Sequence, residues 1–237
     1  NNTNERFRVN MVKHIESIIG NDKELLNKVI PNYPPYGKRM LMDNNWFEML
    51  KKDNVKLITD KVNSITNSSI ETDEYTYKKD AIVMATGFKA SKMIWPIKVL
   101  GKKGINLNDF WNKDNPKANV GITVPNFPNF FIMYGPNTNL AHGGSIVFQG
   151  ECQIRYILGC INLLLEKKYK TMDCMQEPFE KYNSKVDAEH SKMVWTHDKV
   201  NSWYRNGTGR VITNSPWRLI DYWNFTKEPI EQDYKFN

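Results

Sequence analysis

No apolar run in this sequence is long enough to cross a membrane. The longest runs, such as residues 81–85, fall far short of the roughly 18 to 20 residues that a transmembrane helix needs. Cysteine is scarce, and the spacing of Cys152, Cys160 and Cys174 fits neither a CxxC metal half-site nor a disulfide framework. The opening at Asn1 has neither the apolar stretch of a signal peptide nor the Arg-rich composition of a transit peptide. We therefore expect a cytoplasmic protein with reduced thiols, whose first residue marks a cut or a fragment boundary.

The signature motifs of several common enzyme classes are also missing. The sequence contains no GxGxxG, no GxxxxGK[ST], no HExxH and no GxSxG. The histidines His14, His142, His190 and His197 never approach metal-ligand spacing. These absences argue against a metal site and against a self-contained nucleotide-binding, metallo-enzyme or serine-hydrolase domain.

What is present is the composition of an ordinary globular protein, with 237 residues of which 40% are hydrophobic. The 33 Lys and Arg residues outnumber the 26 Asp and Glu residues, but they are interleaved with acids, as at residues 51–53 and 78–80. No basic run is interleaved with aromatic residues, so we expect no nucleic-acid partner. The net charge of +7 favours an anionic cofactor such as a dinucleotide phosphate.

Hydrophobic periodicity predicts helices and short strands. Apolar steps of three and four residues from Phe7 to Val29 predict a helix over residues 5–30, which Pro31 ends. The prolines of residues 31–37 exclude both a helix and a central strand, so we expect an ordered loop there. The other predicted elements are a short helix at 46–50, strands at 55–59 and 62–66, a hairpin at 70–77 and an amphipathic helix at 177–197.

Two continuous apolar runs predict strands buried in a parallel sheet. Residues 81–85 are followed by a Thr-Gly pair, and residues 130–134 by a Gly-Pro-Asn turn. A glycine loop that ends at Ser145 opens the strongest helix of the chain. The apolar residues on one face of this helix are Ile154, Ile157, Leu158, Ile161, Leu164 and Leu165. The order strand, glycine loop, helix is the ligand-facing order of α/β folds, so we expect an α/β protein.

Five motifs follow one another along the chain. They are Tyr33-Pro34-Pro35-Tyr36-Gly37-Lys38-Arg39, Asp53-Asn54-Val55, Ala85-Thr86-Gly87-Phe88, Phe127-Pro128-Asn129-Phe130-Phe131 with Gly135-Pro136-Asn137, and Ser202-Trp203-Tyr204. In this order they resemble the C-terminal part of the flavin-dependent Baeyer–Villiger monooxygenases. Within that family the sequence looks most like the 4-hydroxyacetophenone monooxygenase branch. The resemblance runs from about Glu5 to Tyr234, which is nearly the whole chain.

The resemblance implies an α/β fold built from the C-terminal portions of two dinucleotide-binding, Rossmann-like lobes. Residues 1–88 would form the C-terminal part of an NADP-binding lobe with preceding helices, and residues 89–237 that of an FAD-binding lobe. Family members carry two glycine fingerprints and a linker fingerprint upstream, and this chain contains none of them. We therefore expect a fragment that is inactive alone and whose partner is the missing N-terminal portion of the same enzyme.

The resemblance also implies which residues form the site. Arg39 would be catalytic, because a permanently charged, fork-shaped donor stabilises the negative oxygen that develops during oxygen insertion. Thr138, Asn139 and Leu140 would line the substrate-binding site. The implied cofactor-binding residues are Lys38, Thr86, Gly87, Phe88, Gly135, Pro136, Asn137, Ser145 and Trp203.

A plainer interpretation exists for most of these residues. Lys38 and Arg39 also fit a solvated basic pair, and residues 86–88 fit an ordinary strand end. The sequence around Ser145 would be the same if this residue were only the N-cap of the following helix. Trp203 would look the same as a packing residue in an aromatic cluster.

The implied function is an FAD- and NADPH-dependent oxidation that inserts one oxygen atom of O2 into a small-molecule ketone to give an ester. Two alternatives stay open. One is a flavin monooxygenase that oxygenates nitrogen or sulfur, against which the pair Lys38 and Arg39 argues. The other is a non-catalytic, truncated module that is stable without cofactor.

Overall fold

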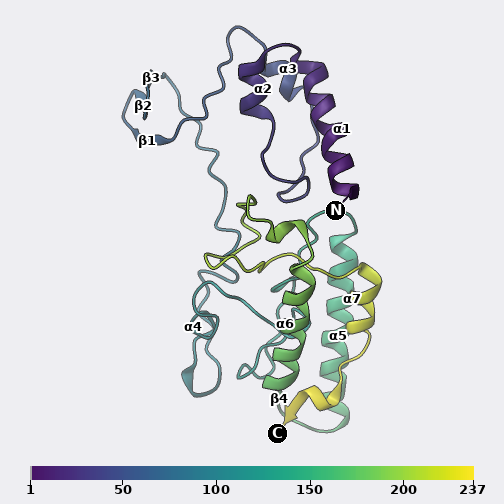
Figure 1. Ribbon diagram of the computed structural model, residues 1–237. Coiled ribbons are helices and arrows are strands. Elements are labelled where there is room, and N and C mark those ends of the chain that lie inside the picture. The colour runs from purple at the N-terminus through teal and green to yellow at the C-terminus, as the bar shows by residue number, and fades with distance from the viewer. Residues whose placement is uncertain (1) are drawn as a thin grey trace. The chain divides into compact units, whose positions relative to one another are not determined.

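The computed structural model describes residues 2–237 and divides into two compact units (Figure 1). Unit 1 comprises Asn1–Asn32 and Leu41–Lys89, and unit 2 comprises Tyr33–Met40 and Ala90–Asn237. The proline-rich loop therefore belongs to unit 2, whereas the resemblance assigned all of residues 1–88 to one lobe. The chain passes from unit 1 into unit 2 and back before it enters unit 2 for good at residue 90.

Unit 1 begins with three helices. They are α1 (Asn2–Ile19), α2 (Lys23–Val29) and α3 (Trp46–Leu50). The break between α1 and α2 has a local cause, because Gly20 has a φ of +76° and Asp22 caps α2 by accepting from the N–H of Leu25 at 2.9 Å. The helix predicted over residues 5–30 is therefore two helices, and the helix predicted at 46–50 is confirmed.

The sheet of unit 1 is antiparallel, with the order β1-β2-β3. Its strands are β1 (Val62–Ile65), β2 (Ser69–Thr72) and β3 (Thr76–Lys78). Ile70 in the central strand pairs with Ile65 on one side and with Tyr77 on the other. The predicted hairpin over residues 70–77 is confirmed. The strand predicted at 55–59 is wrong, because the described chain offers that segment no ladder partner.

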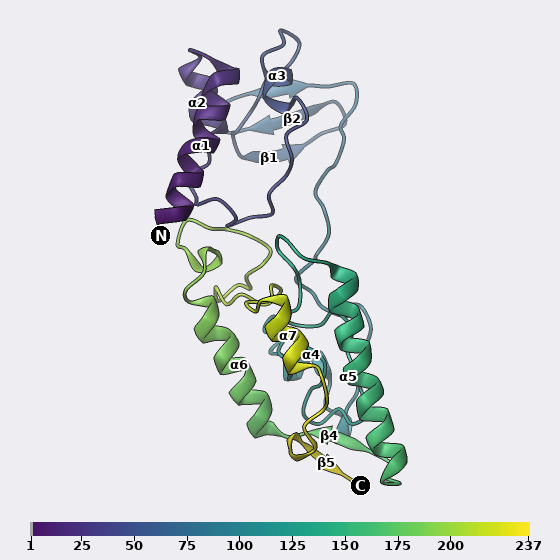
Figure 2. The ribbon, with the colours of Figure 1, turned by 90° about the vertical axis from the view of Figure 1, so that its right-hand side faces the viewer.

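Unit 2 is mostly helical. Its helices are α4 (Leu107–Phe110), α5 (Ile146–Glu166), α6 (Gln176–His190) and α7 (Leu219–Phe225). Two short strands, β4 (Met172–Cys174) and β5 (Tyr234–Phe236), pair in antiparallel fashion, and 3-10 turns occupy Lys102–Gly104, Val194–Thr196 and Glu231–Asp233. Figure 2 shows α5 and α6 along opposite margins of this unit, with α7 between them. The helix predicted at 177–197 is shorter than expected, because α6 ends at His190.

The core of unit 2 forms where α5, α6 and the β4-β5 pair meet. Tyr156 and Cys160 of α5 pack with Phe179 of α6 and Tyr234 of β5. The three cysteines of the chain are free and buried, as expected for reduced thiols. Burial raises the pKa of the Cys160 and Cys174 thiols to about 12, so both stay protonated at neutral pH. These cysteines therefore act as small apolar core residues.

Neither of the two predicted buried strands is a strand in the structure. Residues 81–85 are irregular and mostly exposed, and 90% of Val83 is accessible to solvent. Residues 130–134 also lack a ladder, although they lie in unit 2. Both sheets of the described chain are antiparallel and pair other segments. A strand needs neighbours to satisfy its backbone N–H and C=O groups, so an apolar composition alone does not produce one.

The helix predicted after Ser145 is confirmed as α5, but its orientation is not the one that its apolar face suggests. The side chains that it buries in unit 2 are Gln149, Cys152, Gln153, Tyr156 and Cys160. Six of its large apolar side chains are exposed instead: Ile146, Val147, Ile154, Leu158, Ile161 and Leu165. The apolar face therefore coincides only in part with the face that unit 2 covers.

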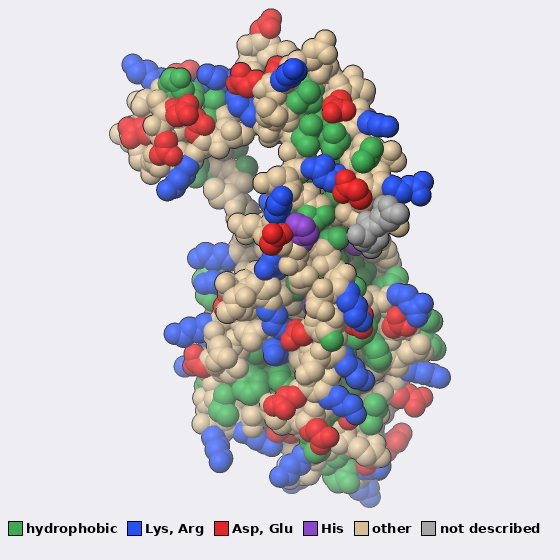
Figure 3. All heavy atoms as spheres, in the orientation of Figure 1, with side chains coloured by type: hydrophobic (Ala, Val, Ile, Leu, Met, Phe, Trp, Pro, Cys, Tyr) green, Lys and Arg blue, Asp and Glu red, His purple; other side chains and the backbone are tan. Residues whose placement is uncertain are grey.

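Charged side chains of both signs are scattered over the surface. Figure 3 shows Lys and Arg interspersed with Asp and Glu over the visible face. Several ion pairs are local and exposed, such as Lys28 with Glu24 at 2.7 Å, and such pairs contribute little to stability. Within residues 2–237, no helix combines the length and the apolar composition that crossing a bilayer would require.

The backbone at Gly135 approaches that at Gly121 so closely that adding a methyl group to Gly135 should destabilise unit 2. A Cβ on Gly135 would lie 2.3 Å from the carbonyl oxygen of Gly121. We expect Gly135→Ala to lower the free energy of unfolding by about 1–3 kcal/mol, because the backbone must shift. Gly150→Ala on α5 is the control, since its Cβ would meet only the Met133 Cε at 4.0 Å and the helix gains up to about 1 kcal/mol. Urea unfolding followed by circular dichroism measures both, and equal effects would contradict the close approach.

Candidate functional site

The proline-rich loop of unit 2 is held on both sides of its turn. The N–H of Gly37 donates to the carbonyl of Pro34 at 3.1 Å, and Tyr36 has a φ of +65°. A Cβ on Gly37 would lie 2.6 Å from Cγ2 of Val200, so glycine allows the loop to approach this segment closely. The indole N–H of Trp195 donates to the carbonyl oxygen of Tyr36 at 3.0 Å. The loop is thereby tied to the segment that follows α6.

Arg39 joins this loop to the loop that precedes α5. Its Nη1 donates to the carbonyl oxygens of Leu140 at 3.3 Å and Ala141 at 3.0 Å. Among the described residues, no other nitrogen of this guanidinium has a protein acceptor. Because Arg39 as a whole is exposed, its Nε and Nη2 can still donate to a ligand. The structure thus places the predicted catalytic residue directly against Leu140, one of the predicted substrate residues.

A histidine that the sequence analysis did not select lies beside Arg39. The ring centroid of His142 is 4.5 Å from that of Tyr36 and 6.3 Å from that of Trp195. Burial and, secondly, the charge of Arg39 lower the pKa of His142. At neutral pH the imidazole is therefore uncharged and adds no repulsion to the guanidinium.

An aromatic cluster continues from this point. Tyr204 packs against Trp195 and Trp203, with ring centroids 6.3 and 4.7 Å away. Tyr204 is 1% exposed, and its hydroxyl has no hydrogen-bond partner among the described residues. Burial raises the pKa of Tyr204, and the charge of Arg39 opposes that rise. Trp203 is 44% exposed, and within the described chain its indole N–H has no acceptor.

The side chains of residues 137–139 are used to hold their own loop. Asn137 Nδ2 donates to the carbonyl oxygens of Val211 at 2.9 Å and Asn214 at 3.3 Å. The hydroxyl of Thr138 donates at 2.7 Å to a carbonyl within the same turn, and Asn139 Nδ2 donates to the side chain of Asn214 at 2.7 Å. Asn137 and Thr138 are buried. The backbone of the loop is engaged as well, because the N–H groups of Asn137 and Asn139 donate to the carbonyl oxygens of Ile212 and Thr213.

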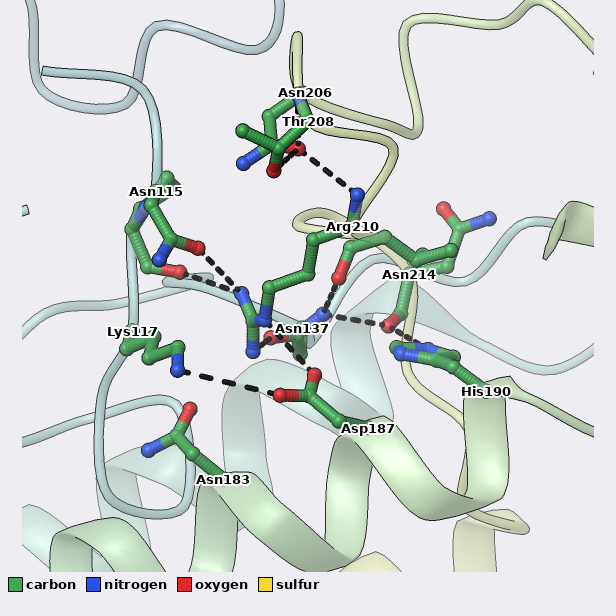
Figure 4. A network of polar contacts seen from close by, with 12 residues as sticks. Asn115, Lys117, Asn137, Asn183, Asp187, His190, Asn206, Thr208, Arg210 and Asn214 are labelled. Atoms are coloured by element: carbon green, nitrogen blue, oxygen red, sulfur yellow. Dashed lines mark hydrogen bonds and ion pairs between the residues drawn. The ribbon is translucent and has the colours of Figure 1, made fainter. Parts of the chain in front are cut away.

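A buried polar network connects this loop to α6 (Figure 4). Arg210 donates through Nε to Asp187 of α6 at 2.8 Å and through Nη2 to Oδ1 of Asn137 at 3.3 Å. Burial lowers the pKa of Arg210, whereas its pairing with Asp187 raises it. His190 Nε2 lies 3.0 Å from the carbonyl oxygen of Asn214, which also accepts from Asn137. The network therefore positions the loop that receives Arg39.

The start of α5 offers unpaired polar groups. Ser145 caps the helix by accepting from the N–H of Phe148 at 3.2 Å. The N–H groups of Ile146 and Val147 have no acceptor within the helix, as in the first turn of any helix. Gln149 is fully buried, and neither end of its amide has a partner in the described part of the chain. Two glycines with φ of +71° and +81° precede the cap; a Cβ on Gly143 would meet nothing within 4 Å, whereas one on Gly144 would lie 2.9 Å from Cδ1 of Leu219.

The remaining predicted cofactor residues have different environments. Gly135 and Pro136 are buried in the turn before Asn137. The ammonium of Lys38 lies 4.5 Å from the ring centroid of Tyr33. Thr86, Gly87 and Phe88 belong to unit 1, where they are exposed in an irregular segment.

Sequence reasoning missed four residues of this arrangement: His142, Gln149, Tyr204 and Arg210. Their importance comes from neighbours distant in the chain, such as Asn137, which lies 73 residues from Arg210. The one available signal was the position of His142 directly before the glycine loop that opens α5.

Comparison with curated proteins shows relatives along almost the entire chain, although no protein-family model matches it. The chain is 40% identical over 236 residues to "Uncharacterized monooxygenase y4iD" of Sinorhizobium fredii, which covers 99% of this chain and 36% of that protein. It is 33% identical over 221 residues to the FAD-binding monooxygenase ktnD of Aspergillus niger, and the match covers 92% of this chain and 36% of that protein. It is 34% identical over 213 residues to a Baeyer–Villiger monooxygenase of Pseudomonas aeruginosa, covering 88% and 40%. These relatives are monooxygenases, and the chain spans less than half of their length.

Solved structures share the fold. The chain matches the OTEMO complex with FAD and NADP with a TM-score of 0.87 and 24% identity, covering 100% of this chain and 45% of that one. It matches the oxidized steroid monooxygenase bound to NADP with a TM-score of 0.84 and 21% identity, covering 98% and 45%. At this level of identity the likeness shows a shared fold over nearly the whole chain.

The buried histidine of the network predicts a pH dependence of stability. Burial lowers the pKa of His190 from 6.5 to about 4, so the unfolded chain binds the proton more readily. The contribution of neutral His190 to the free energy of unfolding is therefore fully present above pH 6.5, the pKa in the unfolded chain. It is lost as the pH falls from 6.5 towards 4, by up to about 3 kcal/mol. Urea unfolding at several pH values measures the loss. His190→Gln should weaken this dependence, and His197→Gln, at an exposed position, should not; an unchanged dependence in His190→Gln would show that another group is responsible.

Proposed function

We propose that this chain is part of an FAD- and NADPH-dependent monooxygenase that inserts one oxygen atom of O2 into a ketone and gives an ester. The observation that carries the proposal is the contact of Arg39 with the carbonyl oxygens of Leu140 and Ala141. It puts a permanent positive charge on the loop assigned to the substrate. The identity of 34% to a Baeyer–Villiger monooxygenase supports this reaction class. The motifs at both ends of the chain support the 4-hydroxyacetophenone monooxygenase branch.

The start of α5 fits a flavin. Free N–H groups at Ile146 and Val147 and the positive end of the helix dipole favour a ring that carries negative charge. The buried, unpaired amide of Gln149 supplies a further donor and acceptor, and such groups normally have a partner. When bound, FAD supplies the activation of O2, while the protein binds, orients and shields. The residues of unit 2 would thus form the FAD side of the site.

Other exposed donors suit NADP. Lys38 has no carboxylate partner in the described chain and can take a phosphate, and the free indole N–H of Trp203 can take a ribose hydroxyl. Thr86, Gly87 and Phe88 in unit 1 are exposed, as cofactor-binding residues would have to be. On this proposal residues 1–88 belong to the NADP-binding lobe and residues 89–237 to the FAD-binding lobe, although Tyr33–Met40 packs within unit 2.

Arg39 stabilises the negative charge that develops on oxygen when the carbonyl carbon of the ketone is attacked. A guanidinium does not lose its proton at any working pH, so this charge is always present. Hydrogen bonds from Nη1 to the loop fix its position and leave its other nitrogens for the substrate. The rings of Tyr36, His142 and Trp195 pack against one another beside this loop.

The chain alone does not hold the whole site. It spans 36% of its Sinorhizobium fredii relative. We propose that a partner portion, corresponding to the rest of that relative, carries the glycine-rich segments that bind both dinucleotides. The free, buried thiols of unit 2 support a reducing compartment, the cytoplasm.

The test fuses this chain to the part of the Sinorhizobium fredii relative that lies outside the matched 36% of that protein. The fused protein should bind FAD, oxidise NADPH and convert ketones to esters, as measured by flavin absorbance and product analysis. Arg39→Ala should reduce ester formation at least about 100-fold, the scale of losing one charge-stabilising donor. NADPH oxidation should continue at a measurable rate, because it does not require that charge.

Arg218→Ala is the control, since Arg218 is exposed on unit 2 and its guanidinium pairs, among residues 2–237, with Asp221 alone. It should leave both rates unchanged. Undiminished ester formation in Arg39→Ala would refute the role of this residue. Oxidation of a thioether or an amine, with no ester from any ketone, would assign the chain to a nitrogen- or sulfur-oxygenating enzyme.

A further inference from the structure

A small pocket of unit 2 lies beside α4 and shares no residue with the arrangement around Arg39. Its volume is about 190 Å³. A cavity of about 150 Å³ holds benzene, so this pocket admits one six-membered ring with a small substituent. It is smaller than the roughly 300–1,000 Å³ of pockets for drug-sized ligands, which excludes a dinucleotide. The lining residues that decide what it can bind are Ser91, Lys92, Trp95, Asn108, Trp111 and Lys113.

Two tryptophans supply apolar surface to this pocket, which we call the α4 pocket. Trp111 is 5% exposed, and its indole N–H donates to the carbonyl oxygen of Lys117 at 2.8 Å. It therefore offers a ligand its ring and no further donor. Trp95 is 60% exposed. Indole rings pack favourably against other planar rings, so the pair favours an aromatic ligand over an inorganic ion.

The polar side chains of the α4 pocket have unused hydrogen-bonding capacity. In the described part of the chain, Lys92 and Lys113 have no carboxylate partner, and the hydroxyl of Ser91 and the side-chain amide of Asn108 make no hydrogen bond. The ammonium of Lys92 lies 6.0 Å from the ring centroid of Trp95. An ammonium can only donate, and a hydroxyl and an amide can donate as well. The four groups together favour an anion that accepts hydrogen bonds.

The charges of other pockets of unit 2 are compensated within the protein. In the pocket that contains Arg218 and Asp221, these two side chains pair with each other at 2.7 Å. In the pocket that contains Lys102, the ammonium pairs with Asp173. The α4 pocket differs from both, because its two cations have no such partner.

One wall of the α4 pocket is fixed before any ligand arrives. The N–H of Lys113 donates to the carbonyl oxygen of Asn108 at 2.8 Å. The carbonyl oxygen of Pro116, which also lines the pocket, accepts from Nη1 of Arg210 at 3.1 Å. Between them, the carboxylate of Asp114 accepts from the N–H of Gly207 at 2.8 Å. A pocket that is already formed loses little conformational entropy when it binds.

We propose that the α4 pocket binds a small aromatic carboxylate, a molecule with one ring and one carboxylate group. The indoles of Trp95 and Trp111 contact the ring, and the ammoniums of Lys92 and Lys113 receive the carboxylate. Aromatic walls with a few polar groups that fix orientation are the usual composition of a small-molecule site. The proposal goes beyond the proposed function, because the α4 pocket contains none of the residues assigned to the ketone or to either dinucleotide.

The test titrates benzoate into the full 237-residue chain and measures the dissociation constant by ligand-detected NMR. Two probes each lack one half of benzoate: acetate has the charge without the ring, and benzyl alcohol has the ring without the charge. Benzoate should bind at least about tenfold more tightly than either probe, because only benzoate uses the lysines and the tryptophans together.

Variants then locate the binding site. The double variant Lys92→Gln/Lys113→Gln should weaken benzoate binding at least about tenfold, because it removes two charged donors. The matched control is Lys227→Gln, since Lys227 is also exposed and its ammonium lies 5.7 Å from the ring centroid of Trp223, close to the 6.0 Å in the α4 pocket. This control and Arg39→Ala should both bind benzoate like the wild type. Circular dichroism confirms that all variants are folded.

Several results would overturn the proposal. One is the absence of benzoate binding up to about 10 mM, which is weak even for a ligand of this size. Another is equal affinity for benzoate and for either probe, which would show a plain anion site or a plain apolar cavity. A third is that the lysine double variant binds like the wild type, or that Lys227→Gln is weakened equally. Loss of binding in Arg39→Ala would place benzoate at Arg39 instead. None of these results depends on ester formation, so the proposed function stands or falls separately.

Discussion

The buried guanidinium of Arg210 determines how the loops of unit 2 are arranged. Its side chain is 12% exposed, and Asp187 of α6 supplies the opposite charge at 2.8 Å. Asp187 is 40% exposed, so it is the loss of Asp187 that would leave a charge, the guanidinium of Arg210, buried without its partner. Asn137 is held by the same guanidinium and by two backbone carbonyls, so the turn after residue 134 has no freedom to move independently of α6.

The geometry around Arg39 is a consequence of that arrangement. Its acceptors are the carbonyl oxygens of Leu140 and Ala141, which lie in the loop that begins at the Asn137 turn and ends at the cap of α5. On the other side, the Trp195 indole holds the proline-rich loop through Tyr36. A charge placed by two anchored loops is preorganised, and preorganised charge is what stabilises a developing oxyanion. Functional residues on loops that a rigid scaffold positions are the common solution in enzymes.

Elements that local chemistry determines, such as the helix after Ser145, form as predicted, whereas elements that require a distant partner do not. The motif ending in Arg39 and the loop at Leu140 were selected separately, and the structure brings them into contact. Tyr204 and Gln149 were not selected, since a buried polar atom without a partner cannot be recognised before the surrounding packing is known. The apolar run at residues 130–134 was expected to be a strand, but strand formation depends on neighbours that the described chain does not supply.

By itself, the sequence determined the helix after Ser145 and the hairpin at residues 70–77, because capping, periodicity and turn composition act over a few residues. It also determined which residues are candidates for the site, through motifs of characteristic composition. Only the tertiary structure decided which face of α5 is buried and which groups meet Arg39. Both depend on contacts between segments that are distant in sequence, such as Arg39 and Ala141, which are 102 positions apart. Local propensity carries no information about such contacts.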